Sequence, residues 1–473
     1  MGTLIGRRRE QDNLDEWCRS SKAELVCVYG RRRVGKTYLV ENTFRYKLAF
    51  SVTGSEDCRT ATQLRVFQRA LKRFGANTGP SLNDWFDAFD RLRDLLEQPD
   101  VRRAEHGRRV VFLDEFPWLA GKRSNFLVAF ADFWNSWASK QDDIMVIVCG
   151  SATSWIVKNV FENTGSMYNR ITRRQYVAPF NLHETERMIQ SMDLGWSRSA
   201  ILHAYLVFGG LPYYLAMLDR RLSLAQNIDE LCLDTHAPLR NEMPHLMEST
   251  LSKLPLYSEV LLLLSKRKTG MHRTEIAKKA STNGSSLKRV LDDLEKCGYI
   301  RKYVNPYERY RPLIYQLIDP FLLFSFTFMS EKAFDRWMDF EGSPAYYAWR
   351  GNAFEIAVLG HIPQIKQALG IAGVQTTCFP WTSTTSTPGA QIDLVIERKD
   401  GVTDLCEMKC TDGPFVATGE VLDSMRRKRS IFCTESGTSN AIHLALVCAP
   451  GIKGTVRPED IAASVGLDDL FAP

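Results

Sequence analysis

The sequence has no long hydrophobic run. Its apolar stretches, such as PFLLFSFTFM, fall far short of the roughly 20 residues that a membrane-spanning helix needs. The opening residues, MGTLIGRRREQDNL, lack the apolar segment of a secretory signal. The eleven cysteines include neither a C-x-x-C pair nor a cysteine–histidine cluster at zinc spacing. We therefore expect a cytoplasmic protein with reduced thiols and no membrane partner.

Internal repeats, low-complexity segments and a strong net charge are also missing. The chain has 473 residues, of which 44% are hydrophobic and 25% charged, and its net charge is +6. This composition is ordinary for a globular protein, and the length suffices for several domains. The mild positive charge permits a nucleic-acid partner but does not require one.

A phosphate-binding loop is indicated near the start of the chain. The apolar run at residues 25–29 predicts a strand, and the segment GRRRVGKT follows it before a helical pattern. In a G-x-x-x-x-G-K-T loop the backbone N–H groups wrap the phosphates, the lysine reaches the β- and γ-phosphates, and the threonine ligates Mg²⁺. We therefore predict that ATP and Mg²⁺ are bound by Gly30, Arg31, Arg32, Arg33, Val34, Gly35, Lys36, Thr37 and Tyr38.

Two further apolar runs end in polar residues suited to ATP hydrolysis. The run at residues 110–113 ends in Asp114 and Glu115. We predict that Asp114 holds Mg²⁺ through water, and that Glu115 orients or deprotonates the attacking water. A third run, IMVIVCGSATSW, leads to Ser151, which either senses the γ-phosphate or caps a helix N-terminus.

Three arginines follow this third run, in the segment YNRITRRQYVAPF. An arginine at this place can act as an arginine finger toward the ATP of a neighbouring subunit. We therefore predict a homo-oligomer in which Arg170, Arg173 or Arg174 has this role. The alternative is a solvated basic loop.

Six segments occur in a fixed order: LIGRRREQDNL, VYGRRRVGKT, FLDEFPWLA, CGSATSW, RITRRQYVAPF and FGGLPYYL. Together they resemble the archaeal-type prokaryotic ATPases, relatives of the AAA+ and STAND P-loop NTPases. The resemblance implies that the G-x-P element ending in Pro212 contacts the adenine from a helical lid. It also implies that Gly6 and Arg7 lie near the base, although Arg8 stands where glutamate is usual.

Helical patterns dominate the middle of the chain. Residues 181–250 suit an all-α lid, and the next 82 residues, 251–332, contain three helical patterns and two strands. The latter order predicts a winged helix-turn-helix. Two aspartates on its third helix weaken the case for DNA, and such modules also dock proteins or domains. If DNA binds, we predict contacts from the third helix and the wing, at Ser285, Ser286, Lys288, Arg289, Arg309 and Arg311.

A hairpin near the C-terminus, GAQIDLVIERKDGVTDLCEMKC, gathers acidic side chains. With a three-residue loop at 399–401, Asp393 faces Glu407, and Lys409 lies on the same face. A helix predicted over residues 346–369 carries Glu355 and precedes three strands, a basic helix and a final strand over residues 441–450. This α-β-β-β-α-β order resembles the PD-(D/E)XK nuclease fold.

The resemblance to these nucleases implies a role for each residue of the cluster. Asp393 and Glu407 hold Mg²⁺ or Mn²⁺ beside a scissile phosphate, Lys409 positions or activates the water, and Glu355 completes the metal shell. A surface cluster of ion pairs, or a degenerate nuclease fold kept for binding, would explain the same residues without cleavage.

We therefore predict an α/β protein with a P-loop ATPase core and parallel sheet at residues 1–180 and a helical lid at 181–250. A winged helix follows at 251–332, and an α/β PD-(D/E)XK nuclease-like domain at 333–473. The predicted function is ATP-dependent DNA binding with ATP hydrolysis and metal-dependent DNA cleavage, in genome defence or mobile-element processing. The alternative is a STAND-like, nucleotide-switched regulator that binds DNA or protein and carries an inactive nuclease fold.

Overall fold

The protein is described here by a computed structural model. It describes residues 4–45, 47–77, 79–121, 124–151, 153–162, 165, 167, 169–242, 246, 255–282, 284–308, 310, 312–329, 336–454, 457 and 460–473. The chain divides into a first compact unit, Met1–Ala178, and a second, Pro179–Met247 with Lys253–Pro473. Within the described ranges, no helix combines the length and the apolar character needed to cross a membrane.

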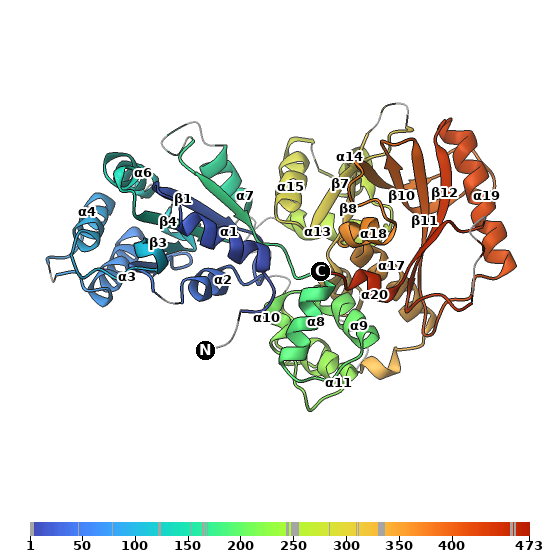
Figure 1. Cartoon of the computed structure of the whole chain (residues 1–473), viewed down its shortest axis with the longest axis horizontal. Helices are drawn as coiled ribbons and strands as arrows, with labels where there is room; N and C mark the ends of the chain where they lie inside the picture. The colour runs from blue at the N-terminus through green and yellow to red at the C-terminus, as the bar shows by residue number, and fades with distance from the viewer. Residues whose placement is uncertain are drawn as a thin grey trace. The chain divides into compact units, whose positions relative to one another are not determined.

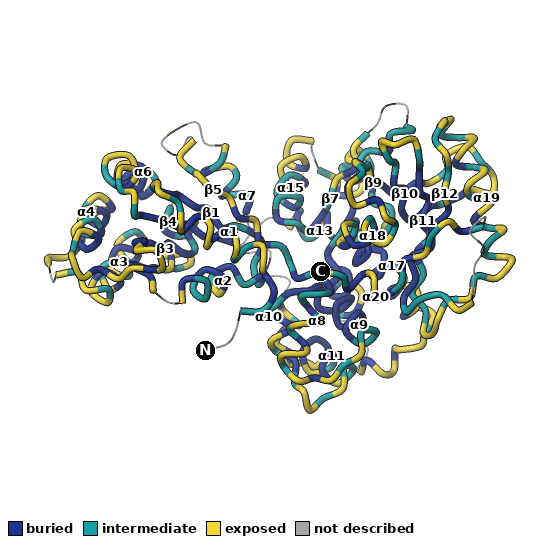
Figure 2. Tube along the Cα trace, viewed as in Figure 1, coloured by how far each residue is buried: buried dark blue, intermediate teal, exposed yellow. Residues whose placement is uncertain are grey.

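A five-stranded parallel sheet forms the centre of the first unit, in the order β2-β3-β4-β1-β5 (Figure 1). The residues of β1, β3 and β4 are almost all buried (Figure 2), as expected for the long apolar runs of a parallel sheet. The predicted parallel sheet is confirmed. Its strands are β1 (Glu24–Tyr29), β2 (Phe50–Thr53), β3 (Arg109–Asp114), β4 (Ile144–Gly150) and β5 (Arg173–Tyr176).

A large hydrophobic core of the first unit lies between this sheet and helices α3 (Thr60–Arg73), α4 (Trp85–Leu96) and α6 (Phe126–Ser136). Trp85 and Phe126 meet edge to face with ring centroids 4.7 Å apart, and Phe89 stacks on Phe133 at 5.3 Å. Such aromatic pairs add to the stability that area burial provides. The other helices of this unit are α1 (Arg8–Cys18), α2 (Lys36–Thr43), α5 (Phe116–Leu119) and α7 (Thr153–Ile156).

The second unit begins with a helical region. A tight turn links two of its helices, because Gly209 and Gly210 both have left-handed φ angles, +68° and +65°. A Cβ atom at Gly210 would lie 2.3 Å from the Phe180 carbonyl oxygen, so only glycine is accommodated there. Pro212 then starts the next helix, in a position that needs no N–H donor. The helices are α8 (Leu182–Ser191), α9 (Arg198–Phe208), α10 (Pro212–Leu215) and α11 (Leu224–Ile228).

Residues 255–317, which we call the helix–sheet segment, contain three helices and a three-stranded antiparallel sheet in the order β6-β8-β7. The predicted helices and strands are present, and the short strand β6 adds to them. The third helix, α15, is held by one fully buried apolar face. The elements are α13 (Pro255–Ser265), β6 (Met271–His272), α14 (Arg273–Lys279), α15 (Gly284–Lys296), β7 (Ile300–Val304) and β8 (Leu313–Leu317); α16 (Pro320–Phe328) follows.

The C-terminal part of this unit, residues 336–473, has a five-stranded sheet in the order β13-β12-β11-β10-β9. Figure 1 shows α19 running alongside the sheet next to β12. The strands are β9 (Thr376–Thr382), β10 (Gln391–Arg398), β11 (Val402–Cys410), β12 (Ala441–Ala449) and β13 (Ala463–Val465). The helices are α17 (Pro344–Leu359), α18 (Ile362–Ala368), α19 (Gly419–Ser436) and α20 (Leu467–Leu470).

Two expectations for this part need correction. The single helix predicted over residues 346–369 is two helices, α17 and α18. The break lies just before Pro363, whose ring and missing N–H do not suit a helix interior but suit the first turn of α18. Strand β12 is also not the last strand, because β13 follows and pairs with it in parallel.

The hairpin of β10 and β11 has the predicted register. Leu394 pairs with Cys406, and Glu397 pairs with Thr403. The same register continued by one residue places Asp393 opposite residue 407. The prediction succeeded because the three-residue loop and the alternation of apolar residues fix the pairing together.

The helix–sheet segment packs against this C-terminal sheet. Tyr303 of β7 belongs to the same hydrophobic core as Phe379 of β9 and Phe432 of α19. The Tyr307 hydroxyl lies 3.1 Å from the carboxylate of Glu397, to which it donates a hydrogen bond. Side chains of the helix–sheet segment therefore lie against the C-terminal sheet.

Candidate functional site

The glycine-rich loop after β1 has the backbone that a phosphate cradle requires. Gly30 has φ +151°, and a Cβ atom there would lie 2.3 Å from the Val177 carbonyl oxygen. Gly35 has φ +83° and directly precedes α2. The Lys36 ammonium is buried and donates to the Arg31 carbonyl at 2.8 Å. The lysine therefore lies within the loop, at the start of a helix whose N-terminal N–H groups favour an anion.

The residues predicted for hydrolysis meet at the carboxyl edge of this sheet. The Thr37 hydroxyl donates to Asp114 Oδ2 at 2.9 Å. The Ser151 hydroxyl donates to the Glu115 carboxylate, with oxygens at 3.1 and 3.2 Å, and the Ser151 N–H lies 3.5 Å from the same carboxylate. Strand β4 lies between β1 and β3, so Ser151 at its end reaches toward Glu115.

Both acids at this edge have perturbed pKa values. Burial raises the pKa of Asp114, against the opposing hydrogen bond from Thr37. Burial also raises the pKa of Glu115, although Lys36 and the Ser151 hydrogen bonds favour its ionised form. A carboxylate with a raised pKa is a better general base than an ordinary one. Mg²⁺ is a hard cation that takes oxygen ligands, so the Asp114 carboxylate and the Thr37 hydroxyl suit that ion.

The other residues predicted to contact the nucleotide are placed differently. Arg7 is buried, has φ +55°, and donates to the Val34 carbonyl at 3.0 Å, so the Gly6–Arg7 element lies against the phosphate loop. Tyr38 is exposed on α2. Pro212 belongs to the second unit, and its contact with adenine stays a prediction.

The three candidate finger arginines have different surroundings. Arg173 forms an ion pair with Glu24 at 3.5 Å, and the Arg174 guanidinium lies over the Phe161 ring at 4.1 Å. Arg170 has an exposed side chain in the turn before β5. All three arginines are exposed, and the role of any of them as a finger stays a prediction.

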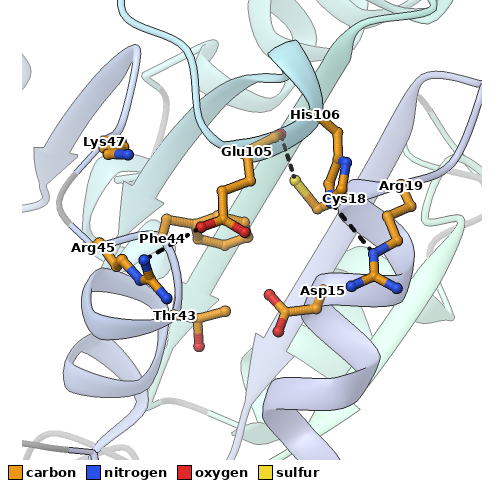
Figure 3. Close-up of a pocket in the computed structure, with 9 residues that line it drawn as sticks. All are labelled: Asp15, Cys18, Arg19, Thr43, Phe44, Arg45, Lys47, Glu105 and His106. Carbon is orange, nitrogen blue, oxygen red and sulfur yellow. Dashed lines mark hydrogen bonds and ion pairs between the residues drawn. The ribbon is translucent and has the colours of Figure 1, made fainter.

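A separate small pocket lies between the C-terminal ends of α1 and α2, away from the phosphate loop at the start of α2 (Figure 3). The Cys18 thiol lies 3.5 Å from the Glu105 carbonyl oxygen, and Arg19 donates to the His106 ring at 3.3 Å. Burial raises the pKa of Cys18 to about 11, so the thiol stays protonated. The cavity of about 10 Å³ holds at most a water molecule.

The predicted DNA-contacting face of α15 is on the surface. Its four predicted residues are exposed, whereas Arg309 and Arg311 lie outside the described residues. Two aspartates of α15 weaken the electrostatic case for DNA binding. One of them, Asp293, accepts a hydrogen bond from the Tyr257 hydroxyl at 2.6 Å. The exposed residues are Ser285, Ser286, Lys288 and Arg289.

The four residues predicted for the C-terminal site line one cavity of about 380 Å³. Asp393 Oδ2 accepts a hydrogen bond from the Met408 backbone N–H at 3.0 Å. The Glu407 carboxylate accepts one from Lys409 at 2.8 Å. Glu355, on α17, completes the set. The side chains thus share one face of the sheet, as the register predicts, and their roles in cleavage stay predictions.

Two lysines that sequence reasoning did not assign to this site also line the cavity. Lys428 of α19 donates to the second Glu407 oxygen at 2.6 Å. Lys268 lies within ion-pair distance of Glu355, and 3.3 Å from Asp393 Oδ1. Lys428 stands in the predicted basic helix, whereas Lys268 lies in a turn of the helix–sheet segment with no local motif to mark it.

The ion pairs with lysine shift the pKa values of Glu407 and Lys409. Burial alone would raise the pKa of Glu407, but Lys409 and Lys428 outweigh it, and its pKa is lowered. Burial likewise opposes the charge of Lys409, but Glu407 outweighs it, and the pKa of Lys409 is raised. Carboxylate oxygens are the donors that Mg²⁺ and Mn²⁺ prefer, so the chemistry of the cluster suits these ions. In their present arrangement, however, no three or more Asp, Glu, His or Cys side chains of the described ranges form a group that could hold a metal ion.

Comparison with known proteins identifies the first part of the chain. Residues 4–218 match the family model of an ATPase domain predominantly from Archaea. This part therefore carries an archaeal-type P-loop ATPase domain, as its motifs predict. An uncharacterized protein of Methanocaldococcus jannaschii is 25% identical over 263 residues, which are 54% of this chain and 53% of that protein. The chain thus spans about half the length of the curated relative it matches.

Solved structures similar to this chain share little sequence identity with it. The Walker-type ATPase PABY2304 of Pyrococcus abyssi is 17% identical, with a TM-score of 0.50 over 68% of this chain and 96% of its own. The ORC2 protein of Aeropyrum pernix, solved as ADPNP and ADP complexes, is 14% identical, with a TM-score of 0.43 over 76% and 95% of the two chains.

Proposed function

We propose that this protein binds Mg·ATP at the loop of residues 30–37 and hydrolyses it with Glu115 as the general base. The observation that carries this proposal is the meeting of Lys36, Thr37, Asp114 and Glu115 at one sheet edge, within a domain that matches an ATPase family. Pro212 and the Gly6–Arg7 element are proposed to contact the base.

The residues of the first unit each have a task in this reaction. The loop N–H groups and Lys36 bind the phosphates, which requires the lysine to leave the Arg31 carbonyl. Mg²⁺, when bound, neutralises charge on the phosphates, and Thr37 and Asp114 would hold it directly or through water. Glu115 takes a proton from the attacking water, and Ser151 keeps its carboxylate in place.

Steady-state hydrolysis tests this proposal. The full chain should release phosphate from ATP only when Mg²⁺ is present, and Lys36→Ala should abolish release because it removes the charge that binds the phosphates. Lys22→Ala, at an exposed residue before β1, is the matched control and should hydrolyse ATP at the wild-type rate. Equal rates in wild type and Lys36→Ala would show that any hydrolysis arises elsewhere.

A second function is proposed for the C-terminal cavity, namely metal-dependent cleavage of DNA in genome defence or mobile-element processing. The observation that favours it is the convergence of Glu355, Asp393, Glu407 and Lys409 on one cavity. The helix–sheet segment, proposed to be a winged helix, would bring DNA through the exposed face of α15. The regulatory alternative, an inactive nuclease fold, predicts DNA or protein binding without cleavage.

In this cleavage site, the acidic residues would hold Mg²⁺ or Mn²⁺, which when bound stabilises charge on the scissile phosphate. Asp393 is kept in place by the Met408 N–H, and Lys409 is held by Glu407 in position to orient water. Lys428 neutralises the second oxygen of Glu407, so the approach of a phosphate is not opposed by an unpaired acid.

Cleavage of supercoiled and linear DNA, with Mn²⁺ and with or without ATP, tests this second function. Asp393→Ala should lose metal and cleavage together, whereas Lys409→Ala should lose cleavage and keep much of the metal. Asp400→Ala, in the exposed hairpin loop, is the control and should cleave normally. Intact DNA under every condition, with ATP hydrolysis preserved, would leave the regulatory function in its place.

A further inference from the structure

The C-terminal cavity contains a cation supplied by the chain itself. The Lys268 ammonium lies within ion-pair distance of Glu355 and 3.3 Å from Asp393 Oδ1, so it sits between two of the three carboxylates. Asp393 directs its other oxygen to the Met408 N–H. Lys268 therefore contacts the Asp393 oxygen that remains available to a metal.

The charges of the cavity balance without a metal ion. Glu355, Asp393 and Glu407 supply three negative charges, and three lysines, at positions 268, 409 and 428, supply three positive ones. Carboxylates this close repel one another unless cations lie between them. With all three lysines in place the cluster is neutral, and withdrawal of one lysine leaves a net negative charge that attracts a divalent ion.

The backbone that carries Lys268 is held by hydrogen bonds, whereas its side chain is partly exposed. Gln316 donates to the Lys268 carbonyl at 2.6 Å, and the Tyr303 hydroxyl donates to the Thr269 carbonyl. Gly270 has φ +77°, and a Cβ atom there would lie 2.3 Å from a carbonyl oxygen of β8. The Lys268 side chain is 39% exposed, so its ammonium can leave the cavity by rotation about its own flexible stem.

We propose that Lys268 is a built-in counter-ion that competes with the divalent metal and holds the C-terminal site in a closed, metal-free form. This inference rests on the metal site proposed above. It assigns the helix–sheet segment a regulatory role in addition to the proposed DNA binding, because a metal reaches the free Asp393 oxygen only when a side chain of that segment withdraws.

Titration of Mn²⁺ into the metal-free full chain, followed by calorimetry, tests this proposal. Lys268→Gln should bind Mn²⁺ about tenfold more tightly than wild type, the equivalent of one lost competing ion pair. Lys266→Gln removes the same charge from an exposed position in the same turn and should bind as wild type does. Lys268→Arg keeps the charge and should also bind weakly. Asp393→Ala, introduced into wild type and into each lysine variant, shows whether the heat of Mn²⁺ binding comes from this site.

The outcomes separate the two proposals. If wild type and Lys268→Gln bind Mn²⁺ equally and through Asp393, the metal site stands and the competition is refuted. If Lys268→Arg tightens binding as much as Lys268→Gln does, charge is not the cause and the proposal is equally refuted. If no variant binds Mn²⁺ through Asp393, both proposals fail.

A second measurement uses the wild-type chain and does not depend on the folding of a variant. Acetylation of lysines by a short reagent pulse, read by mass spectrometry, reports how accessible each amine is. Mn²⁺ should raise the labelling of Lys268 about threefold or more, because displacement from Glu355 exposes the amine, and should leave Lys266 unchanged. Unchanged labelling of Lys268 at saturating Mn²⁺ would overturn the proposal.

Discussion

Replacement of Glu115 by glutamine removes the proposed general base while keeping its shape. The Ser151 hydroxyl can still donate to the amide oxygen, so the local structure is retained. Burial raises the pKa of Glu115 above its ordinary value of 4.5, and Asp114 raises it further while Lys36 lowers it. Loss of this carboxylate also removes a buried like-charge contact with Asp114. ATP binding in Glu115→Gln should therefore equal or exceed that of wild type.

The expected loss of turnover follows from the role of the base. General-base catalysis contributes about 10²–10⁴-fold, so kcat should fall by that factor, or about 3–5 kcal/mol in activation free energy. The assay is phosphate release at saturating Mg·ATP, with Glu16→Gln, an exposed residue of α1, as the matched control. The base acts only when ionised, and its pKa is raised above 4.5. Wild-type turnover should therefore fall as the pH decreases, and this fall should begin at a pH above 4.5. The mutant should lose this pH dependence. A kcat within about twofold of wild type would refute the role.

Three further predictions concern assembly, DNA and acid sensitivity. Arg170→Ala should abolish a rise of ATPase rate with protein concentration while preserving ATP affinity, and a rate that never depends on concentration would exclude a finger in trans. Alanine at Lys288 and Arg289 should reduce the slope of log affinity for duplex DNA against log salt by about 1 per residue, and an unchanged slope would remove α15 from the interface. Burial lowers the pKa of His203 to about 4, so only the unfolded chain takes up its proton between pH 6.5 and 4. The unfolding free energy in urea should fall as pH decreases through this window, by up to about 1.4 kcal/mol per unit, and His203→Gln should flatten the fall.

The phosphate loop and the hairpin could be predicted because their geometry is local. Gly30 and Gly35 lie within one short loop, and each adopts a backbone that only glycine accepts readily. In the hairpin, a three-residue loop fixed the register, and the pairing of Asp393 with its neighbours followed. Short-range constraints of this kind involve only residues that are close together in the sequence, so they can be predicted from the sequence alone.

The contacts of Lys268 could not be predicted, because they depend on tertiary packing. Its partner Asp393 is 125 residues away in sequence. The meeting requires Tyr303 and Tyr307 to pack against the C-terminal core, which no local pattern specifies. The break between α17 and α18, by contrast, has a local signal, because Pro363 marks it in the sequence. The prediction of one continuous helix relied on the helical periodicity alone and therefore missed the break.

Binding of a non-hydrolysable ATP analogue, measured by calorimetry on the full chain with Mg²⁺, tests whether the phosphate loop binds nucleotide. We expect one analogue to bind per chain, no detectable binding in Lys36→Ala, and binding at least as tight as wild type in Glu115→Gln. Failure of the wild-type chain to bind the analogue, or equal binding by Lys36→Ala, would contradict this expectation.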